Sequence, residues 1–97
     1  MKPSVALEKH REAVRAVIQR YPTIANPRVF GSVLHGDDTD ESDLDLLVDA
    51  LPGTSLFTLG GLQDELESML SVPVDVVLAD ELHRRIKNRV LAEATSL

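Results

Sequence analysis

The sequence predicts one small α+β domain over residues 1–97, a mixed β-sheet backed by helices. At 97 residues the chain is long enough for a single core and too short for a core plus a separate substrate domain. Short apolar strand patterns alternate with helical periodicity, in the order αβαβαβα. The loop between the first two strands, Gly36 to Ser42, is too short for a parallel crossover, so we expect these strands to be antiparallel.

The first half of the chain begins with an amphipathic helix, expected from Ser4 to Arg20. Its apolar residues fall at helical spacing, at Val14, Val17, Ile18 and Tyr21. We expect Ser4 to cap this helix and Pro22 to end it. A short strand, Arg28–Phe30, then runs into Gly31-Ser32 and a brief helical turn over residues 33–35.

The second half begins with a buried strand, Leu44–Val48, which ends at Pro52-Gly53. A helix starting at Ser55 or later follows, and its apolar face carries Leu59, Leu62, Leu66, Met69 and Leu70. Pro73 opens a third strand, Val74–Leu78. We expect a last helix from Glu81 to about Ala94.

The charge is unevenly distributed along the chain. The net charge is −6, which argues against direct, sequence-independent binding of nucleic acid, because such binding relies on many Lys and Arg contacts to phosphate. Residues 31–80 carry twelve Asp or Glu and no Lys or Arg. An anionic ligand bound there therefore needs a metal, backbone N–H groups, or cations from the two ends of the chain.

The composition also bears on the cellular compartment. There is no cysteine, so disulfides and thiolate metal sites are excluded. No apolar run approaches the roughly 18–20 residues of a membrane span, and the opening residues are not followed by the apolar segment of a signal peptide. We expect a cytoplasmic protein with no membrane partner.

Three acidic residues form the candidate chemical site. Asp43 and Asp45 alternate along a strand and so point to one face, about 6–7 Å apart. Two carboxylates at this spacing can hold a pair of Mg²⁺ ions against the phosphates of a nucleotide. Asp75 is the one charge in an apolar strand and, if buried, would need a partner such as a shared metal. Without metal, the three carboxylates should repel one another and raise at least one pKa.

Gly31-Ser32 supplies the complementary groups on the phosphate side. Gly31 lets the backbone approach phosphate oxygens, and the Ser32 hydroxyl with the N–H groups of the next turn adds donors where cationic side chains are absent. Taken singly, Asp-x-Asp can be a solvated strand end, Gly-Ser can be a turn, and Asp75 can end a strand on a sheet edge. Ten residues separate the two motifs in a strand–loop–strand setting, and this combination favours the nucleotide site.

Other phosphate and metal motifs fit less well. Gly31 and Gly36 have the glycine spacing of a P-loop, but Asp37 and Asp38 stand where Lys and Ser or Thr are required. An EF-hand beginning at Asp38 would place Asp43 at the obligatory glycine. The three histidines lack ligand spacing, so zinc is not expected.

The segment GSVLHGDDTDESDLDLLVD, Gly31 to Asp49, resembles the polymerase-β-like nucleotidyltransferases, and specifically their minimal single-domain members, the MntA-like antitoxins. Asp75 matches the third carboxylate of that family. The resemblance implies a palm-like fold and Mg²⁺-dependent transfer of a nucleoside monophosphate, AMP if ATP is the donor, with release of pyrophosphate. It also implies that Gly31 and Ser32 hold the phosphates, that Asp43 and Asp45 hold two metals, and that Asp75 shares the catalytic metal and helps to activate the acceptor hydroxyl.

The resemblance further implies a partner. Minimal members of the family are encoded beside a HEPN-domain ribonuclease toxin and neutralise it by forming a complex, by adenylylating a tyrosine, or both, so we expect a hetero-oligomer with a toxin. Family members often carry arginine before the second glycine, where this chain has Leu34 and His35. Lys87 or the pair Arg84-Arg85 would compensate if the last helix packs near the site; the alternative is that these cations lie on a solvated helix face or contact a partner.

Two alternatives to a protein adenylyltransferase stay open. The chain could be a non-catalytic module that silences its partner by covering it, with exposed apolar residues such as Leu56, Phe57 or Leu97 at the interface. It could also be a small-molecule nucleotidyltransferase of the aminoglycoside type, which the small size disfavours.

Overall fold

The computed structural model describes residues 1–97 and contains one mixed sheet of four strands, in the order β3-β2-β1-β4. The strands are β1 (Ile24–Phe30), β2 (Leu44–Ala50), β3 (Val74–Leu78) and β4 (Thr95–Ser96). β1 pairs antiparallel with β2 and with β4, whereas β2 and β3 are parallel. The predicted α+β class and the antiparallel pairing of the first two strands are confirmed.

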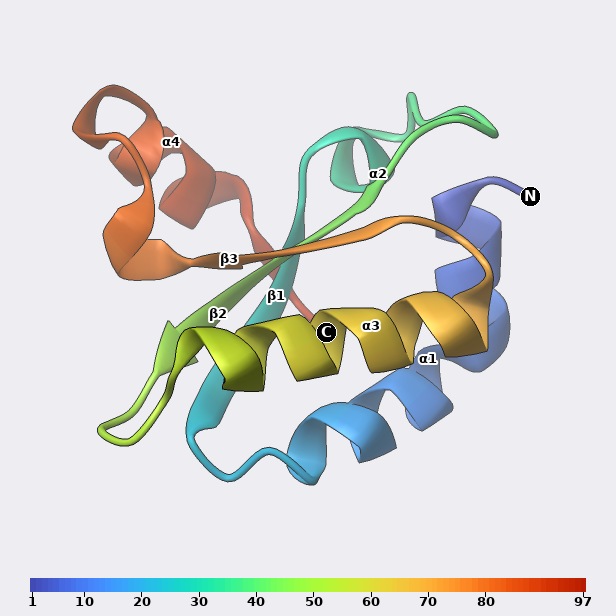
Figure 1. Cartoon of the computed structure of the whole chain (residues 1–97). Coiled ribbons are helices and arrows are strands. Elements are labelled where there is room, and N and C mark those ends of the chain that lie inside the picture. The colour runs from blue at the N-terminus through green and yellow to red at the C-terminus, as the bar shows by residue number, and fades with distance from the viewer.

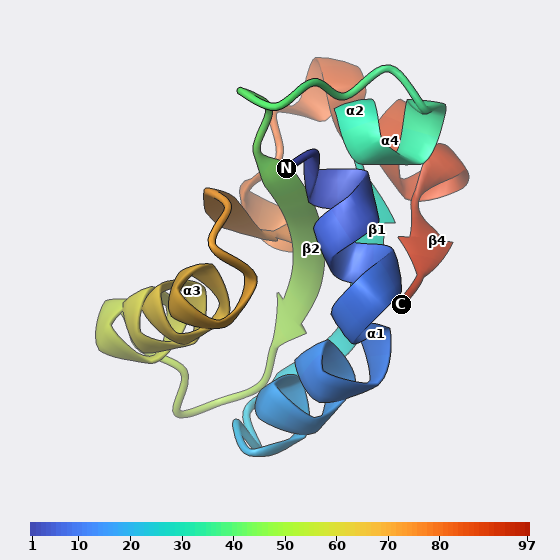
Figure 2. The ribbon, with the colours of Figure 1, turned by 90° about the vertical axis from the view of Figure 1, so that its right-hand side faces the viewer.

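Helices lie on both sides of this sheet. α1 (Pro3–Gln19) and α3 (Leu56–Leu70) pack side by side on one face (Figure 1). After β3, a 3₁₀ turn η1 (Ala79–Glu81) leads to α4 (Arg84–Glu93), which lies on the other side of the sheet from α3 (Figure 2). None of these helices is long and apolar enough to cross a membrane.

The core lies between the sheet and the α1/α3 pair. Strand β2 runs through its centre, and Leu44, Leu46 and Val48 are fully buried against the helices. The predicted apolar faces supply the other side, since Val14, Val17 and Ile18 of α1 are buried. Leu62, Leu66 and Leu70 of α3 are buried there too. The short, leucine-rich pattern of β2 therefore reflects a central strand.

The N-terminus of α1 differs from the prediction. The helix begins at Pro3 with Lys2 as its N-cap residue, so the assignment of Ser4 as the cap was wrong. The backbone N–H of Ser4 instead donates to Oδ2 of Asp38, 2.8 Å away in the loop before β2. Asp38 is buried, and this backbone hydrogen bond outweighs the effect of burial and lowers the pKa of its carboxyl. A distant carboxylate thus caps α1 and anchors the acidic loop.

Other element boundaries were extended or moved by contacts that local patterns do not show. β1 starts at Ile24, before the predicted Arg28, because a bulge at Asn26-Pro27 lets the strand continue across turn-type residues. α4 starts at Arg84, later than the predicted Glu81, with the His83 side chain accepting from the N–H of Arg85.

In the second half of the chain, the start of α3 confirms a prediction and the C-terminal residues correct one. α3 starts as expected, with a capping box between Ser55 and Thr58. Strand β4 was not predicted. It brings Leu97 into the core, where it is only 6% exposed, so the assignment of Leu97 to an exposed interface was wrong.

Candidate active site

Gly31 and Asp45 are brought together by the pairing of β1 with β2. Phe30, the last residue of β1, pairs with Asp45 on β2, which places the Asp45 side chain over the following Gly31. Gly31 has φ +76°, a conformation that residues with a side chain rarely adopt, and a Cβ added there would overlap Oδ2 of Asp45. Both the backbone conformation and the space therefore require glycine. The structure thus explains the glycine of the motif by its contact with the carboxylate.

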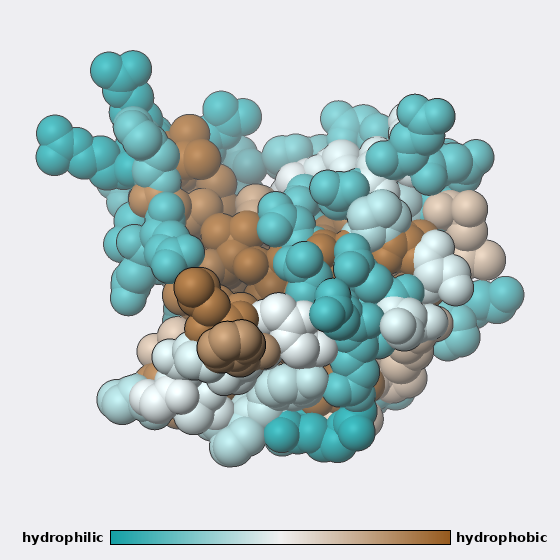
Figure 3. All heavy atoms as spheres, in the orientation of Figure 1, coloured by the Kyte–Doolittle hydropathy of each residue, from teal (hydrophilic) through white to brown (hydrophobic).

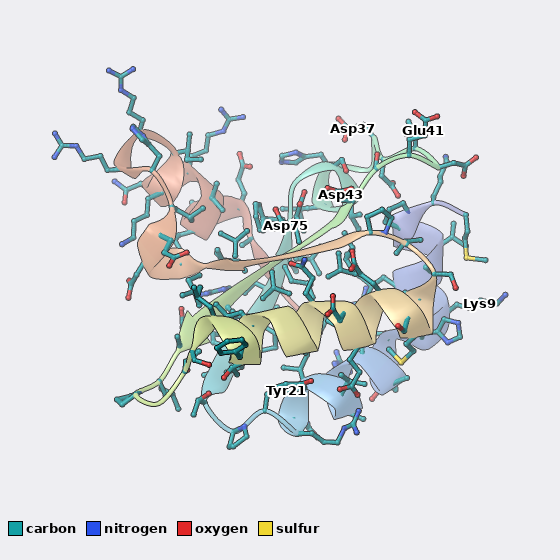
Figure 4. The ribbon with its side chains drawn as sticks, in the orientation of Figure 1. Lys9, Tyr21, Asp37, Glu41, Asp43 and Asp75 are labelled. Carbon is teal, nitrogen blue, oxygen red and sulfur yellow. The ribbon has the colours of Figure 1, made fainter.

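Asp43 and Asp75 lie beside Asp45. In the parallel β2/β3 pair, Asp45 and Asp75 are register partners, so both point to the sheet face opposite α1 and α3. Asp43 stands just before β2, two residues from Asp45. Figure 4 shows Asp43 and Asp75 near the α2 end of the sheet, where α2 is the turn Ser32–His35, with Asp37 and Glu41 farther out on the loop.

The three carboxylates interact electrostatically. Burial, with further contributions from the charges of Asp75 and Asp43, raises the pKa of Asp45 from 3.8 to about 6. Asp45 is half-buried, whereas Asp43 and Asp75 are exposed. This agrees with the expectation that clustered carboxylates raise at least one pKa in the absence of metal. The three side chains form one acidic site.

Asp75 lies at a sheet edge, which is the alternative to a buried carboxylate that the sequence left open. Asp75 is exposed because β3 is an edge strand, so its charge does not by itself demand a metal. The strand is instead held by α3. Glu67 Oε2 accepts from the N–H of Val74 at 2.9 Å, and Gln63 Oε1 accepts from the N–H of Val76 at 3.2 Å. These bonds satisfy the backbone N–H groups at the free edge of β3 on both sides of Asp75, and they fix the position of its carboxylate.

The fit of this site to Mg²⁺ rests on its chemistry. No group of three Asp, Glu or His side chains in the structure converges closely enough to hold a metal ion as it stands. The donors are nevertheless the hard oxygen ligands that Mg²⁺ prefers, and a cation would offset both the burial and the neighbouring charges that raise the pKa of Asp45. Asp43, Asp45 and Asp75 are the residues that would hold such an ion.

The cations of the last helix fit the solvated-face alternative better than a place at the site. Lys87 Nζ lies 3.7 Å from Asp80 on η1, and the exposed Arg84 and Arg85 do not line the pocket beside Gly31. The cation of α4 that does line it is Arg89.

Arg89 was missed although helical periodicity carries the signal. The residues that α4 contributes to this pocket, Ile86, Arg89, Val90 and Glu93, are spaced i, i+3, i+4 and i+7. On the opposite wall are Gly31 and His35. The cation was therefore identifiable once the helix face that meets Gly31 was known.

Comparisons with known proteins agree on one family. Residues 10–97 match the family model described as the nucleotidyltransferase domain. The protein adenylyltransferase MntA of Thermococcus cleftensis is 38% identical over 65 residues, which are 67% of this chain and 66% of that protein. A solved structure described as a candidate minimal nucleotidyltransferase is 39% identical, with a TM-score of 0.85, over 97% of this chain and 95% of that one.

A more distant likeness is to the MNT antitoxin complex of Shewanella oneidensis, described as containing a tri-AMPylated HEPN toxin. The TM-score is 0.69 at 18% identity, over 92% of this chain and 69% of the matched chain. At this identity the likeness shows a shared fold.

Proposed function

The chain belongs to the nucleotidyltransferase domain family, and from this membership we propose that it transfers AMP from ATP to a protein hydroxyl, as the antitoxin of a HEPN/MNT pair. The observation that carries the proposal is the acidic site of Asp43, Asp45 and Asp75 beside Gly31. The 38% identical relative named as a protein adenylyltransferase supports it. Because ATP is the donor, we expect the reaction to take place in the cytoplasm.

The residues of the site have separate roles in this proposal. Asp43, Asp45 and Asp75 would hold two Mg²⁺ ions, which supply positive charge to the phosphates and to the attacking oxygen. Gly31 has no side chain and so leaves room for the Asp45 carboxylate next to the nucleotide. Ser32 contacts the phosphates. The acceptor oxygen forms a bond to the α-phosphorus, the bond to pyrophosphate breaks, and the hydroxyl proton leaves toward the exposed carboxylate of Asp75.

The exposure of the site favours a protein acceptor. Asp43 and Asp75 lie on the surface, so a hydroxyl on another protein can reach them. The pocket next to Gly31 measures about 150 Å³, smaller than the roughly 300–1,000 Å³ typical of sites that enclose a whole small molecule. An aminoglycoside-type acceptor would have to bind without enclosure, and we therefore place the acceptor on the HEPN partner.

The decisive experiment is a mass measurement. The protein is incubated with Mg-ATP and the HEPN-domain protein encoded beside it, and intact masses are recorded. We expect AMP additions on the partner, and none with Asp43→Ala/Asp45→Ala. The matched control is Asp64→Asn, which alters an exposed aspartate on α3 and should leave the additions unchanged. An unmodified partner after incubation with the wild-type protein would exclude the transfer reaction.

A second candidate function is inhibition by covering the partner, and one surface feature favours it. Leu56 and Phe57 at the start of α3 are 81% and 90% exposed, and hydrophobic side chains protrude at that end of α3 in the space-filling view (Figure 3). Exposed apolar pairs of this kind commonly mark protein interfaces. If Asp43→Ala/Asp45→Ala still neutralises the partner and Leu56→Asp/Phe57→Asp does not, occlusion is the mechanism.

A further inference from the structure

A small pocket lies between α4 and the end of β1. Its volume is about 150 Å³, with Gly31 and His35 on one wall and Arg89 and Glu93 of α4 on the other. The pocket adjoins the glycine that contacts Asp45, so it opens beside the acidic site. Any group that extends from that site toward α4 meets these side chains.

Glu93 binds both basic side chains of this pocket. Its Oε2 lies 3.0 Å from Nε2 of His35, and its Oε1 lies 3.6 Å from Nε of Arg89. All three side chains are 41–74% exposed, and ion pairs this exposed contribute little to folding. α4 itself has no buried residue. The arrangement therefore does not serve mainly to hold the helix in the fold.

The charges of the surrounding chain indicate a role in ligand binding for Arg89, His35 and Glu93. Between residues 31 and 80 there is no Lys or Arg, so His35 is the one basic side chain of that segment that a polyphosphate at Gly31 can meet. Arg89 adds a guanidinium, whose donors match phosphate oxygens well. The carboxylate of Glu93 occupies both groups and would repel the same phosphates.

We propose that Arg89 and His35 bind the phosphates of the nucleotide and that Glu93 is a built-in competitor that holds them in the free protein. This rests on the proposed function, since it assigns contacts within that nucleotide site. Nucleotide binding then requires Glu93 to release the two side chains. The role of Glu93 is to position them and to weaken affinity.

Binding measurements with matched variants test this proposal. Titrations use a non-hydrolysable ATP analogue, tripolyphosphate and adenosine, each with Mg²⁺. Arg89→Ala should weaken binding of the analogue and of tripolyphosphate about tenfold and leave adenosine unchanged, as expected for one lost charge-assisted contact. Glu93→Gln should tighten binding about three- to tenfold, and His35→Arg should tighten it as well. Arg84→Ala is the control on the same helix and should change affinity less than twofold.

Each of the other outcomes contradicts a defined part of the proposal. Unchanged affinity in Arg89→Ala, or weaker binding in Glu93→Gln, excludes the competitor arrangement while the nucleotide site stands. A loss of adenosine affinity in Arg89→Ala would place Arg89 at the nucleoside, which contradicts the phosphate contact. If the folded wild-type protein binds neither analogue nor tripolyphosphate, the proposed function itself fails, and the inference fails with it. Melting curves should coincide for all variants, because the substituted side chains are exposed.

Discussion

Replacing Asp45 by Asn should stabilise the metal-free protein. Burial and the neighbouring carboxylates raise the pKa of Asp45 from 3.8 to about 6, so folding disfavours its charged form. A shift of about two units corresponds to at most about 3 kcal/mol at neutral pH. Because Asp45 is only half-buried, solvent screens part of this, and we expect a gain of about 1–2 kcal/mol from the substitution.

The pH dependence follows from the direction of the shift. A carboxyl with a raised pKa in the folded state costs stability as pH rises from its ordinary value through about 6, and the full cost is present above that. The advantage of Asp45→Asn should therefore be complete at about pH 7.5 and fall to about a third of that at about pH 4.5 by the same linkage.

Urea unfolding in EDTA at both pH values measures this effect. Asp64→Asn, at an exposed position on α3, controls for the loss of one negative charge from an acidic protein and should change stability by less than about 0.5 kcal/mol. Added Mg²⁺ should stabilise the wild-type protein more than Asp45→Asn. If Asp45→Asn is no more stable than the wild type at pH 7.5, burial and the neighbouring carboxylates together do not disfavour the charged form of Asp45 as the structure indicates.

Three further predictions concern the scaffold of the site. Gly31→Ala should lose about 1–3 kcal/mol of stability and displace the Asp45 carboxylate that contacts it. Gly60→Ala, whose added methyl meets no neighbouring atom, should not destabilise the protein, and equal melting temperatures for the two variants would contradict the overlap. Asp38→Ala should cost about 1 kcal/mol of stability, because it removes the cap of α1. Since the pKa of Asp38 is lowered in the folded protein, this loss of stability should shrink as pH falls below 3.8, and a difference that does not change with pH would argue against an ionised cap. Gln63→Ala/Glu67→Ala should speed amide exchange in β3 without unfolding the protein, and unchanged β3 protection would refute the tether from α3.

Much of the fold could be predicted because its signals are local. The apolar faces of α1 and α3 repeat at helical spacing, and the short loop before β2 enforces an antiparallel turn. The misplaced features depend on partners far along the chain. Asp38 caps α1 at Ser4, 34 residues earlier, and β4 pairs only with β1, whose partner residues lie 66 and 68 positions earlier. Neither Ser4 nor Thr95 carries a local pattern that announces such a partner.

The candidate site also has features that the sequence predicts and features that depend on distant segments. The sequence by itself determined which side chains could act, because Asp43 and Asp45 share a face by strand alternation and Gly31-Ser32 stands at a fixed spacing before them. Only the tertiary structure decided the environment of each group. Strand order leaves Asp75 exposed at an edge, and strand pairing sets Asp45 over Gly31.

The packing of α4 was likewise decided by the tertiary structure, and it brings Arg89 and Glu93 to the same place as Gly31. Alternation and periodicity are properties of neighbouring residues, so the sequence displays them directly. Burial, charge repulsion and counter-charges depend on which distant segments meet, and that is set by the packing of the whole chain.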